Sequence, residues 1–208
     1  ISNVRSFMAR SKFTNKPDPP AFVQSHARMK AKLKAFIDPP SRTLLNYKED
    51  DKRVEARYAR AIAYYRIPKL TRSLPLINGL IKEHPTDPYF QELKGQILFE
   101  NGNIVGALPH YEKAVLLSQE SHLLHRALGR VQIETNDPAL LQKAIKNLNI
   151  ALNADKTDTF TWRLLGTAYG KAGNFGKSSL ALAEEALLNR DPKNALLHAK
   201  RAAATFKK

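Results

Sequence analysis

Apolar residues recur every three or four positions along most of this chain, and strict alternation of apolar and polar residues is missing. A spacing of three or four places apolar side chains on one face of an α-helix, whereas a half-buried strand would alternate. The apolar runs are also long and rich in alanine, which favours a helix over a strand. The pattern therefore predicts an all-α fold without a β-sheet.

The clearest unit is the stretch of residues 88–121, in which a turn at Gly102 joins two predicted helices. Gly95 stands where the two helices have to pack closely, and Ala107 and Tyr111 lie four residues apart on the second helix. Small residues let the helices approach each other, and the aromatic ring fills the remaining space between them. A small residue, a turn glycine and an alanine–aromatic–alanine stripe within 34 residues form the tetratricopeptide pattern.

The same unit recurs with a constant period. Ala61 stands 34 residues before Gly95, Gly129 stands 34 residues after it, and the segment around Gly166 gives the fullest match. One repeat cannot bury its own apolar face, so neighbouring repeats stack on each other. We therefore predict a tetratricopeptide-repeat α-solenoid, a right-handed superhelix of about four helix pairs, over residues 54–208. The predicted repeats span residues 54–87, 88–121, 122–158 and 159–190, and a capping helix spans residues 192–206.

The fourth repeat contains the single tryptophan of the chain. Trp162 precedes Leu165 and Tyr169 on the first helix of this repeat, at helical spacing. A large aromatic side chain at such a position is expected to fill the gap between paired helices. We predict that Trp162 lies largely buried between the two helices of the fourth repeat.

Residues 1–53 precede the repeats and predict a helical lead-in that packs on the first of them. Residues 1–12 are typical of the end of a helix, and a proline-containing break follows. A second, amphipathic helix is predicted from the prolines at 19–20 to about Ile37. Its apolar residues recur at spacings of three or four and are Phe22, His26, Met29, Leu33 and Phe36.

The chain of 208 residues is strongly basic, with 34 Lys and Arg against 19 Asp and Glu and a net charge of +15. The lysines of the segment MKAKLKAF alternate, which spreads their charge around a helix instead of along one side. Nucleic acid is therefore not the expected partner, because binding it would need a focused basic face. No run of 18 apolar residues predicts a membrane span, and the absence of cysteine excludes disulfides and thiolate metal sites.

The sequence also lacks the motifs of catalysis. It contains no His-Glu-x-x-His, no Gly-x-Ser-x-Gly, no phosphate-binding glycine-rich loop and no cysteine nucleophile. His122 and His125 are three residues apart on a predicted helix and could share a metal, but no further ligand stands at a suitable spacing. They are better interpreted as part of a helix surface. We predict no catalytic residue, no metal site and no cofactor in this chain.

Binding to a protein or an extended peptide is the function that remains. In stacked helix pairs the first helix of each repeat lines a concave groove. Arginines can bind carboxylates with two parallel hydrogen bonds and aromatic rings supply contact area, so this groove would suit an extended peptide, with acidic peptides favoured. The alternative is that these side chains are the ordinary solvated surface of a scaffold. The predicted groove residues are Tyr58, Tyr65, Arg66, Gln96, Phe99, Arg126, Arg130, Arg163 and Lys171.

Four segments follow one another in a distinctive order, and they are DPPAFVQSHARMKAKLKAFIDPPSRTLLNY, ARYARAIAYYR, HPTDPYFQELKGQILFENG and WRLLGTAYGKAGN. This order resembles the C-terminal region of bacterial zinc metallopeptidases of the beta-barrel assembly-enhancing protease type, which are relatives of the CAAX prenyl proteases. In that family an N-terminal catalytic domain carries the His-Glu-x-x-His zinc site, and the repeats follow it. None of those zinc residues is present here, so no catalytic residue carries over.

The resemblance implies an accessory domain in a periplasm that recruits substrate, its own catalytic domain or the outer-membrane protein assembly machinery. Zinc and proteolytic activity would belong to the catalytic domain. Since the chain begins at Ile1 and shows no signal peptide, we expect it to be part of a longer protein. The alternative is a free-standing tetratricopeptide adaptor or scaffold in secretion or envelope assembly.

Overall fold

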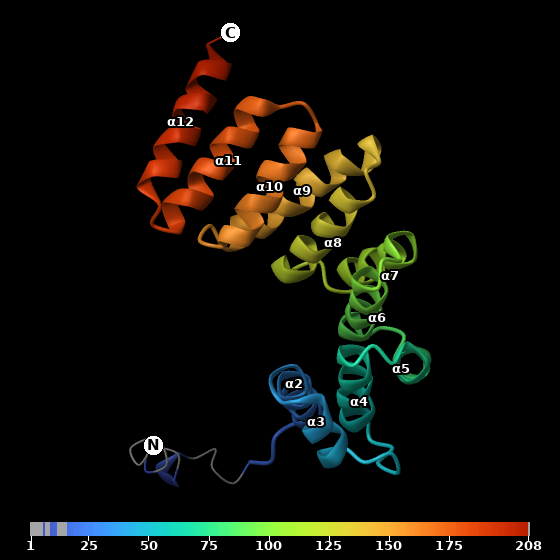
Figure 1. Ribbon diagram of the computed structural model, residues 1–208. Helices are drawn as coiled ribbons and strands as arrows, with labels where there is room; N and C mark the ends of the chain where they lie inside the picture. The colour runs from blue at the N-terminus through green and yellow to red at the C-terminus, as the bar shows by residue number, and fades with distance from the viewer. Residues whose placement is uncertain (1–5, 7–8, 12–15, 208) are drawn as a thin grey trace. The chain divides into compact units, whose positions relative to one another are not determined.

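The computed structural model describes residues 6, 9–11 and 16–207, and within these residues it contains helices and no strand (Figure 1). The prediction of an all-α fold is confirmed. The predicted helix over residues 1–12 falls mostly outside the described residues. The helices are α2 (Pro20–Ile37), α3 (Pro40–Asn46), α4 (Val54–Arg66), α5 (Leu70–Glu83), α6 (Pro88–Glu100), α7 (Ile104–Leu117), α8 (His122–Glu134), α9 (Pro138–Ala154), α10 (Thr159–Lys171), α11 (Phe175–Leu188) and α12 (Pro192–Phe206).

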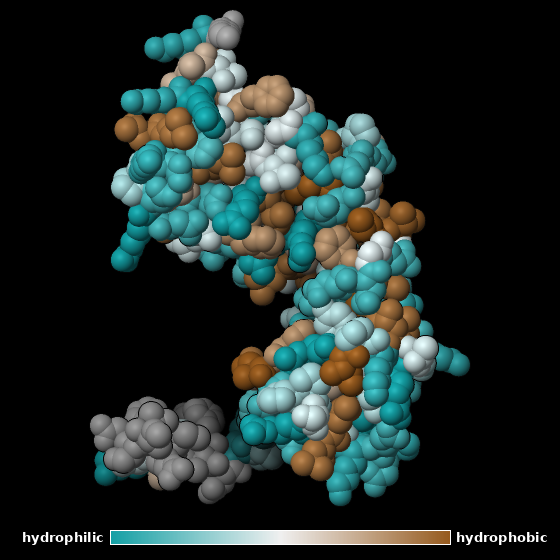
Figure 2. All heavy atoms as spheres, in the orientation of Figure 1, coloured by the Kyte–Doolittle hydropathy of each residue, from teal (hydrophilic) through white to brown (hydrophobic). Residues whose placement is uncertain are grey.

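The contacts between residues divide the chain into two compact units, which are residues 1–80 (unit 1) and residues 81–208 (unit 2). The division falls inside α5, and the sequence-based boundary after residue 53 stays a prediction. The four predicted helix pairs are α4 with α5, α6 with α7, α8 with α9, and α10 with α11. The predicted closing helix is α12. Figure 2 shows that the visible face is mainly hydrophilic, with apolar residues in scattered patches.

In unit 1, α2 and α3 pack on α4. The contact face of α2 is formed by Ala31 and Ala35, which have no exposed area. The larger apolar side chains point away from this contact, since Phe22, Met29 and Leu33 are 69%, 53% and 54% exposed. The packing face of α2 is therefore its alanine face and not its face of larger apolar residues.

The physical reason is that α4 is itself rich in alanine on the side it buries, including Ala56, Ala59 and Ala63. Two faces of small residues let helix backbones come close together, and close packing of many atoms stabilises such a contact. The α2 alanines lie four residues apart and form the matching stripe. Bulky residues at the same positions would have held the helices apart.

In unit 2, each helix packs on the next along the chain, from α6 to α12. The close approach within a pair occurs at a glycine of the first helix. A Cβ atom on Gly95 would stand 2.8 Å from the Tyr111 ring, and one on Gly129 would stand 2.9 Å from Leu148. A Cβ atom on Gly166 would likewise stand 3.0 Å from the Leu182 side chain. The helix pairs are therefore in phase with the glycines from which the repeat was predicted.

The repeats also share polar details. Ser73 Oγ donates a hydrogen bond to the Ala61 carbonyl at 2.8 Å, and Ser178 Oγ donates to the Gly166 carbonyl at the same distance. Both pairs join a small residue of the first helix to a serine twelve residues later, so the first and fourth repeats are built alike. Ordinary buried hydroxyl groups need such a partner.

Trp162 is only partly buried. Its ring packs against the outside of a core that includes Leu148, Leu165 and Ala168, and its indole Nε1 donates to the Lys156 carbonyl at 2.9 Å. The prediction that Trp162 lies largely buried is confirmed in part, since the ring packs on this core without being fully enclosed. An indole N–H needs an acceptor, and here the acceptor is a loop carbonyl at the edge of the core, which keeps one side of the ring near solvent.

Candidate functional site

The nine predicted groove residues lie on four first helices. Tyr58, Tyr65 and Arg66 belong to α4 in unit 1, and the other six belong to α6, α8 and α10 in unit 2. The two groups are described separately.

The α4 residues do not form an open groove. Tyr58 has no exposed area and belongs to the core of unit 1, whereas Tyr65 is half-buried. Arg66 donates to the carbonyl oxygens of Ala35 at 2.7 Å and Asp38 at 2.5 Å. The last carbonyls of a helix lack partners within it, so Arg66 caps the C-terminal end of α2. The predictions that placed Tyr58 and Arg66 at a ligand are therefore corrected, because one is buried and the other holds the lead-in helix.

In unit 2, three first helices bring two aromatic rings and two arginines together. The guanidinium carbon of Arg130 on α8 lies 4.7 Å from the ring centre of Phe99 on α6 and 6.0 Å from that of Phe160 on α10. The guanidinium carbon of Arg126 lies 5.8 Å from the Phe160 ring centre. These distances are those of cation–π contacts. We call Phe99, Arg126, Arg130 and Phe160 the Arg130 surface.

Phe160 was not predicted, although a signal for it exists in the sequence. It is the second residue of α10, and the second position of a repeat is one of those that point from the first helix into the groove. Its ring is 39% exposed. Phe160 completes the surface around Arg130.

Arg126 already has a counter-ion. Its NH1 donates to Asp158 Oδ2 at 2.7 Å, and Asp158 also caps α10 by accepting hydrogen bonds from the backbone N–H groups of Phe160 and Thr161. Burial would raise the pKa of the Asp158 carboxyl, but the hydrogen bonds from Thr161 and Arg126 and the charge of Arg126 outweigh it and lower the pKa. Asp158 therefore stays ionised and fixes the position of Arg126.

Arg130 is exposed, and no ion pair joins it to a carboxylate within the part of the chain that the structure describes. The nearest acidic influence is Glu100 on α6. Burial raises the pKa of Glu100 above its ordinary value, and the charge of Arg130 offsets part of that rise. The Arg130 guanidinium thus lies against two aromatic rings, where it can still donate hydrogen bonds to a carboxylate.

The remaining predicted residues have other partners. Gln96 Nε2 donates to Glu100 Oε1 at 3.0 Å along α6. Arg163 donates to Glu185 Oε1 of α11 at 2.8 and 2.6 Å. Lys171 Nζ donates to the Ile133 carbonyl at 3.1 Å and to Asn136 Oδ1 at 2.7 Å, which ties the end of α10 to the end of α8. Tertiary contacts therefore occupy three of the predicted cations, Arg126, Arg163 and Lys171.

The histidine pair considered for a metal is also explained by its contacts. His125 is buried, its Nδ1 lies 2.8 Å from Asn147 Oδ1, and its Nε2 lies 2.9 Å from the Gln119 carbonyl oxygen. One ring nitrogen thus has its partner on α9 and the other in the loop before α8, so the interpretation of His125 as part of a helix surface is wrong. Across residues 6, 9–11 and 16–207, no group of three His, Cys, Asp or Glu side chains is placed to hold a metal ion, and no helix is long and apolar enough to cross a membrane.

Solved structures with the same fold are known. The crystal structure of YrrB, described as a TPR protein with an unusual peptide-binding site, is 17% identical, with a TM-score of 0.64 over 82% of this chain and 88% of that one. A MamA fragment from Desulfovibrio magneticus RS-1 is 18% identical, with a TM-score of 0.66 over 82% and 97% of the two chains. The AMB-1 form of MamA is 17% identical, with a TM-score of 0.65 over 79% and 98%.

At these identities the similarity shows the fold alone, and it shows that this chain is a tetratricopeptide-type α-solenoid. No protein-family model matches the sequence, and no curated protein matches it either.

Proposed function

We propose that this chain is a protein–protein interaction domain that binds an extended peptide on the Arg130 surface. One observation carries the proposal. Arg130 lies between the rings of Phe99 and Phe160, which come from successive first helices, and it has no carboxylate partner in the described part of the chain. Aromatic and arginine side chains supply most of the binding energy in protein interfaces, so this cluster has the composition of a contact centre.

The cluster also indicates the chemistry of the peptide. Arg126 is neutralised by Asp158, so one guanidinium, that of Arg130, remains for the ligand. A single acidic side chain or a terminal carboxylate could bind it with two parallel hydrogen bonds. The exposed parts of the two phenylalanine rings would contact an apolar or aromatic neighbour of that acid. The surface therefore suits a mixed acidic and apolar segment better than a polyacidic one.

The finer assignment rests on the resemblance in sequence. We propose that the chain is the substrate- or partner-recruiting part of a periplasmic zinc metallopeptidase that acts in envelope protein quality control. The partners would be its own catalytic domain, client proteins and the outer-membrane protein assembly machinery. Zinc and the peptidase reaction would belong to the catalytic domain, since this chain offers no His-Glu-x-x-His motif.

A free-standing adaptor in secretion or envelope assembly is the second candidate. The two candidates differ in what precedes Ile1. A reading frame that encodes His-Glu-x-x-His upstream of Ile1 supports the metallopeptidase. A reading frame that starts close to Ile1 without that motif supports the adaptor.

The proposed peptide binding is tested by selecting random displayed peptides on the purified 208-residue chain. We expect the enriched peptides to place Asp or Glu beside an aromatic or large apolar residue. Competition by a selected peptide against the others would show that they share one site. Enrichment of basic peptides, or of no consensus at all, would contradict the proposed chemistry of the Arg130 surface.

A further inference from the structure

Unit 1 contains a pocket of about 330 Å³ between the loop of residues 47–53 and helices α4 and α5. Its lining is strongly unbalanced in charge. Four cationic side chains, Lys52, Arg57, Arg60 and Arg72, line it together with a single carboxylate, that of Glu49. We call this cavity the Arg60 pocket.

Arg60 is the most buried of the four cations and is only 3% exposed. Its NH1 donates to the carbonyl oxygens of Tyr47 and Lys48, and its NH2 donates to the Asp51 carbonyl oxygen at 2.8 Å. These acceptors are all neutral. A guanidinium has five N–H donors, so the three carbonyls leave two of them for another acceptor. Burial lowers the pKa of Arg60, which means that its charge lacks full compensation.

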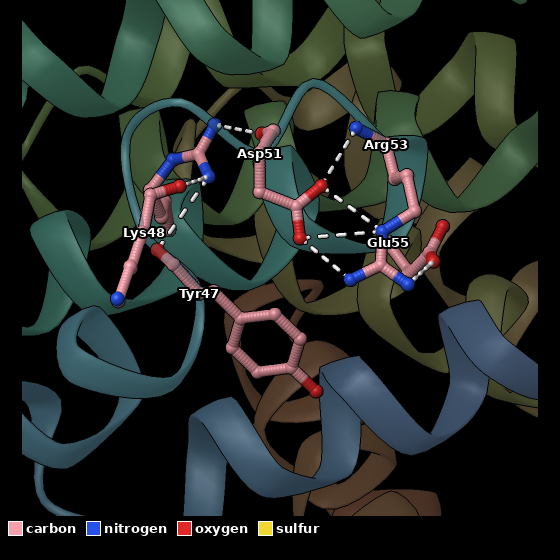
Figure 3. A network of polar contacts seen from close by, with 6 residues as sticks. Tyr47, Lys48, Asp51, Arg53 and Glu55 are labelled. Atoms are coloured by element: carbon pink, nitrogen blue, oxygen red, sulfur yellow. Dashed lines mark hydrogen bonds and ion pairs between the residues drawn. The ribbon is translucent and has the colours of Figure 1, made fainter.

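The nearby acids do not supply that compensation directly. Figure 3 shows the Asp51 carboxylate turned towards Arg53, whose Nε and NH2 donate to it at 3.0 and 2.6 Å. Arg53 NH1 also lies 3.4 Å from Glu55 Oε1. The side-chain hydrogen bond from Arg53 is the main reason that the pKa of Asp51 falls to about 2. The carboxylates of Asp51 and Glu55 therefore both pair with Arg53, which does not line the pocket.

Glu49 shows how the pocket binds a carboxylate. Its Oε1 accepts a hydrogen bond from the Tyr64 hydroxyl at 2.9 Å and pairs with Arg72 NH2. The Arg72 guanidinium lies over the Tyr64 ring, 4.6 Å from its centre, so both donors are fixed against each other. The Glu49 side chain itself is 66% exposed. Moving an exposed side chain costs little free energy, so an external anion could replace the Glu49 carboxylate.

We propose that the Arg60 pocket binds a compact oxyanion, a carboxylate or phosphate group, which displaces Glu49 from Tyr64 and Arg72 and accepts hydrogen bonds from Arg60. The volume of the pocket suits a small dicarboxylate or inorganic phosphate. The charge ratio of four cations to one carboxylate favours an anion with more than one negative charge. This site lies in unit 1 and does not depend on peptide binding at the Arg130 surface in unit 2.

The test is titration calorimetry of the 208-residue chain with inorganic phosphate and, separately, with succinate, at constant ionic strength set by sodium chloride. We expect saturable binding to one site for at least one of the two probes, and the stronger probe identifies phosphate or carboxylate as the group preferred. Glu49→Gln should bind more tightly than the wild type, because the neutral amide competes less well than the carboxylate for Tyr64 and Arg72.

Arg72→Gln should weaken binding about tenfold or more, since a hydrogen bond to a charged group is lost. Arg163→Gln in unit 2 removes the same charge away from the pocket and should leave the affinity unchanged. Circular dichroism of each variant reports whether it is folded, and Arg60 itself is left intact because it holds the loop. Equal weakening by Arg72→Gln and Arg163→Gln would show attraction by net charge only and overturn the proposal, as would the absence of saturable binding for both probes.

Discussion

The ring of Tyr111 lies directly against Gly95, so that a Cβ atom added to the glycine would stand 2.8 Å from the ring atoms Cδ2 and Cε2. Tyr111 is only 6% exposed and has no room to withdraw. Gly95→Ala should therefore destabilise unit 2 by about 1–3 kcal/mol, because overpacking outweighs the gain in helix propensity of about 1 kcal/mol.

Gly170→Ala is the matched control for this prediction. A Cβ atom on Gly170 would stand 3.3 Å from Ser178 Oγ and 4.0 Å from Ser178 Cβ, so a shift of a few tenths of an ångström relieves the contact while the hydrogen bond from Ser178 to Gly166 is kept. This variant should be as stable as the wild type or slightly more stable. Chemical denaturation followed by circular dichroism measures both changes. If Gly95→Ala proved as stable as Gly170→Ala, the close packing of α6 on α7 would be wrong.

The two faces of α2 predict opposite responses to substitution. Ala35→Leu should destabilise unit 1 by about 1–3 kcal/mol, since it forces a large side chain into the contact with α4. Leu33→Ala should change the stability by no more than about 0.5 kcal/mol, because Leu33 is exposed. Thermal unfolding of the two variants separates these outcomes, and a large loss in Leu33→Ala would show that the bulky face is the packed one.

Asp158 predicts a pH dependence. Its folded pKa is lowered, so its contribution to stability is present above its unfolded pKa of 3.8 and is lost as the pH falls through the lower folded value. Asp158→Asn keeps a capping side chain but removes the charge that pairs with Arg126, and it should cost about 1 kcal/mol at neutral pH. The difference from the wild type should shrink towards zero in strong acid.

Urea denaturation at pH 7 and in strong acid measures this difference in stability between Asp158→Asn and the wild type. The exposed Glu112→Gln serves as the control, and a difference for Asp158→Asn that stays constant with pH would contradict the assigned role.

The repeat itself could be read from the sequence because it depends on local rules. A glycine at a fixed period, a turn and a stripe of small and aromatic residues specify each helix pair, and Gly95 and Gly129 are found where this pattern puts them. The packing face of α2 could not be read in this way. That helix has two apolar faces, one of large residues and one of alanine. The alanine-rich surface of α4 determines that the alanine face is the one that packs.

The candidate site was harder to predict because charge pairing is a tertiary property. Periodicity correctly placed Arg163 and Lys171 on a first helix, but it contained no information about Glu185 on α11 or the free carbonyls at the end of α8. Arg66 similarly donates a hydrogen bond to a carbonyl of α2, a helix that ends 29 residues earlier, at Ile37. Only Arg130, with its aromatic neighbours, retained the character expected from the sequence.

The central claim, that Arg130 between Phe99 and Phe160 is the centre of a peptide-binding surface, is tested most directly by one affinity comparison. A peptide selected on the wild-type chain is titrated against the wild type, Arg130→Gln and Lys143→Gln, with Lys143 exposed on α9. The account predicts that Arg130→Gln weakens binding about tenfold or more and reduces its dependence on salt, while Lys143→Gln changes neither and both variants stay fully helical. Equal affinity of the wild type and Arg130→Gln for this peptide would contradict the account.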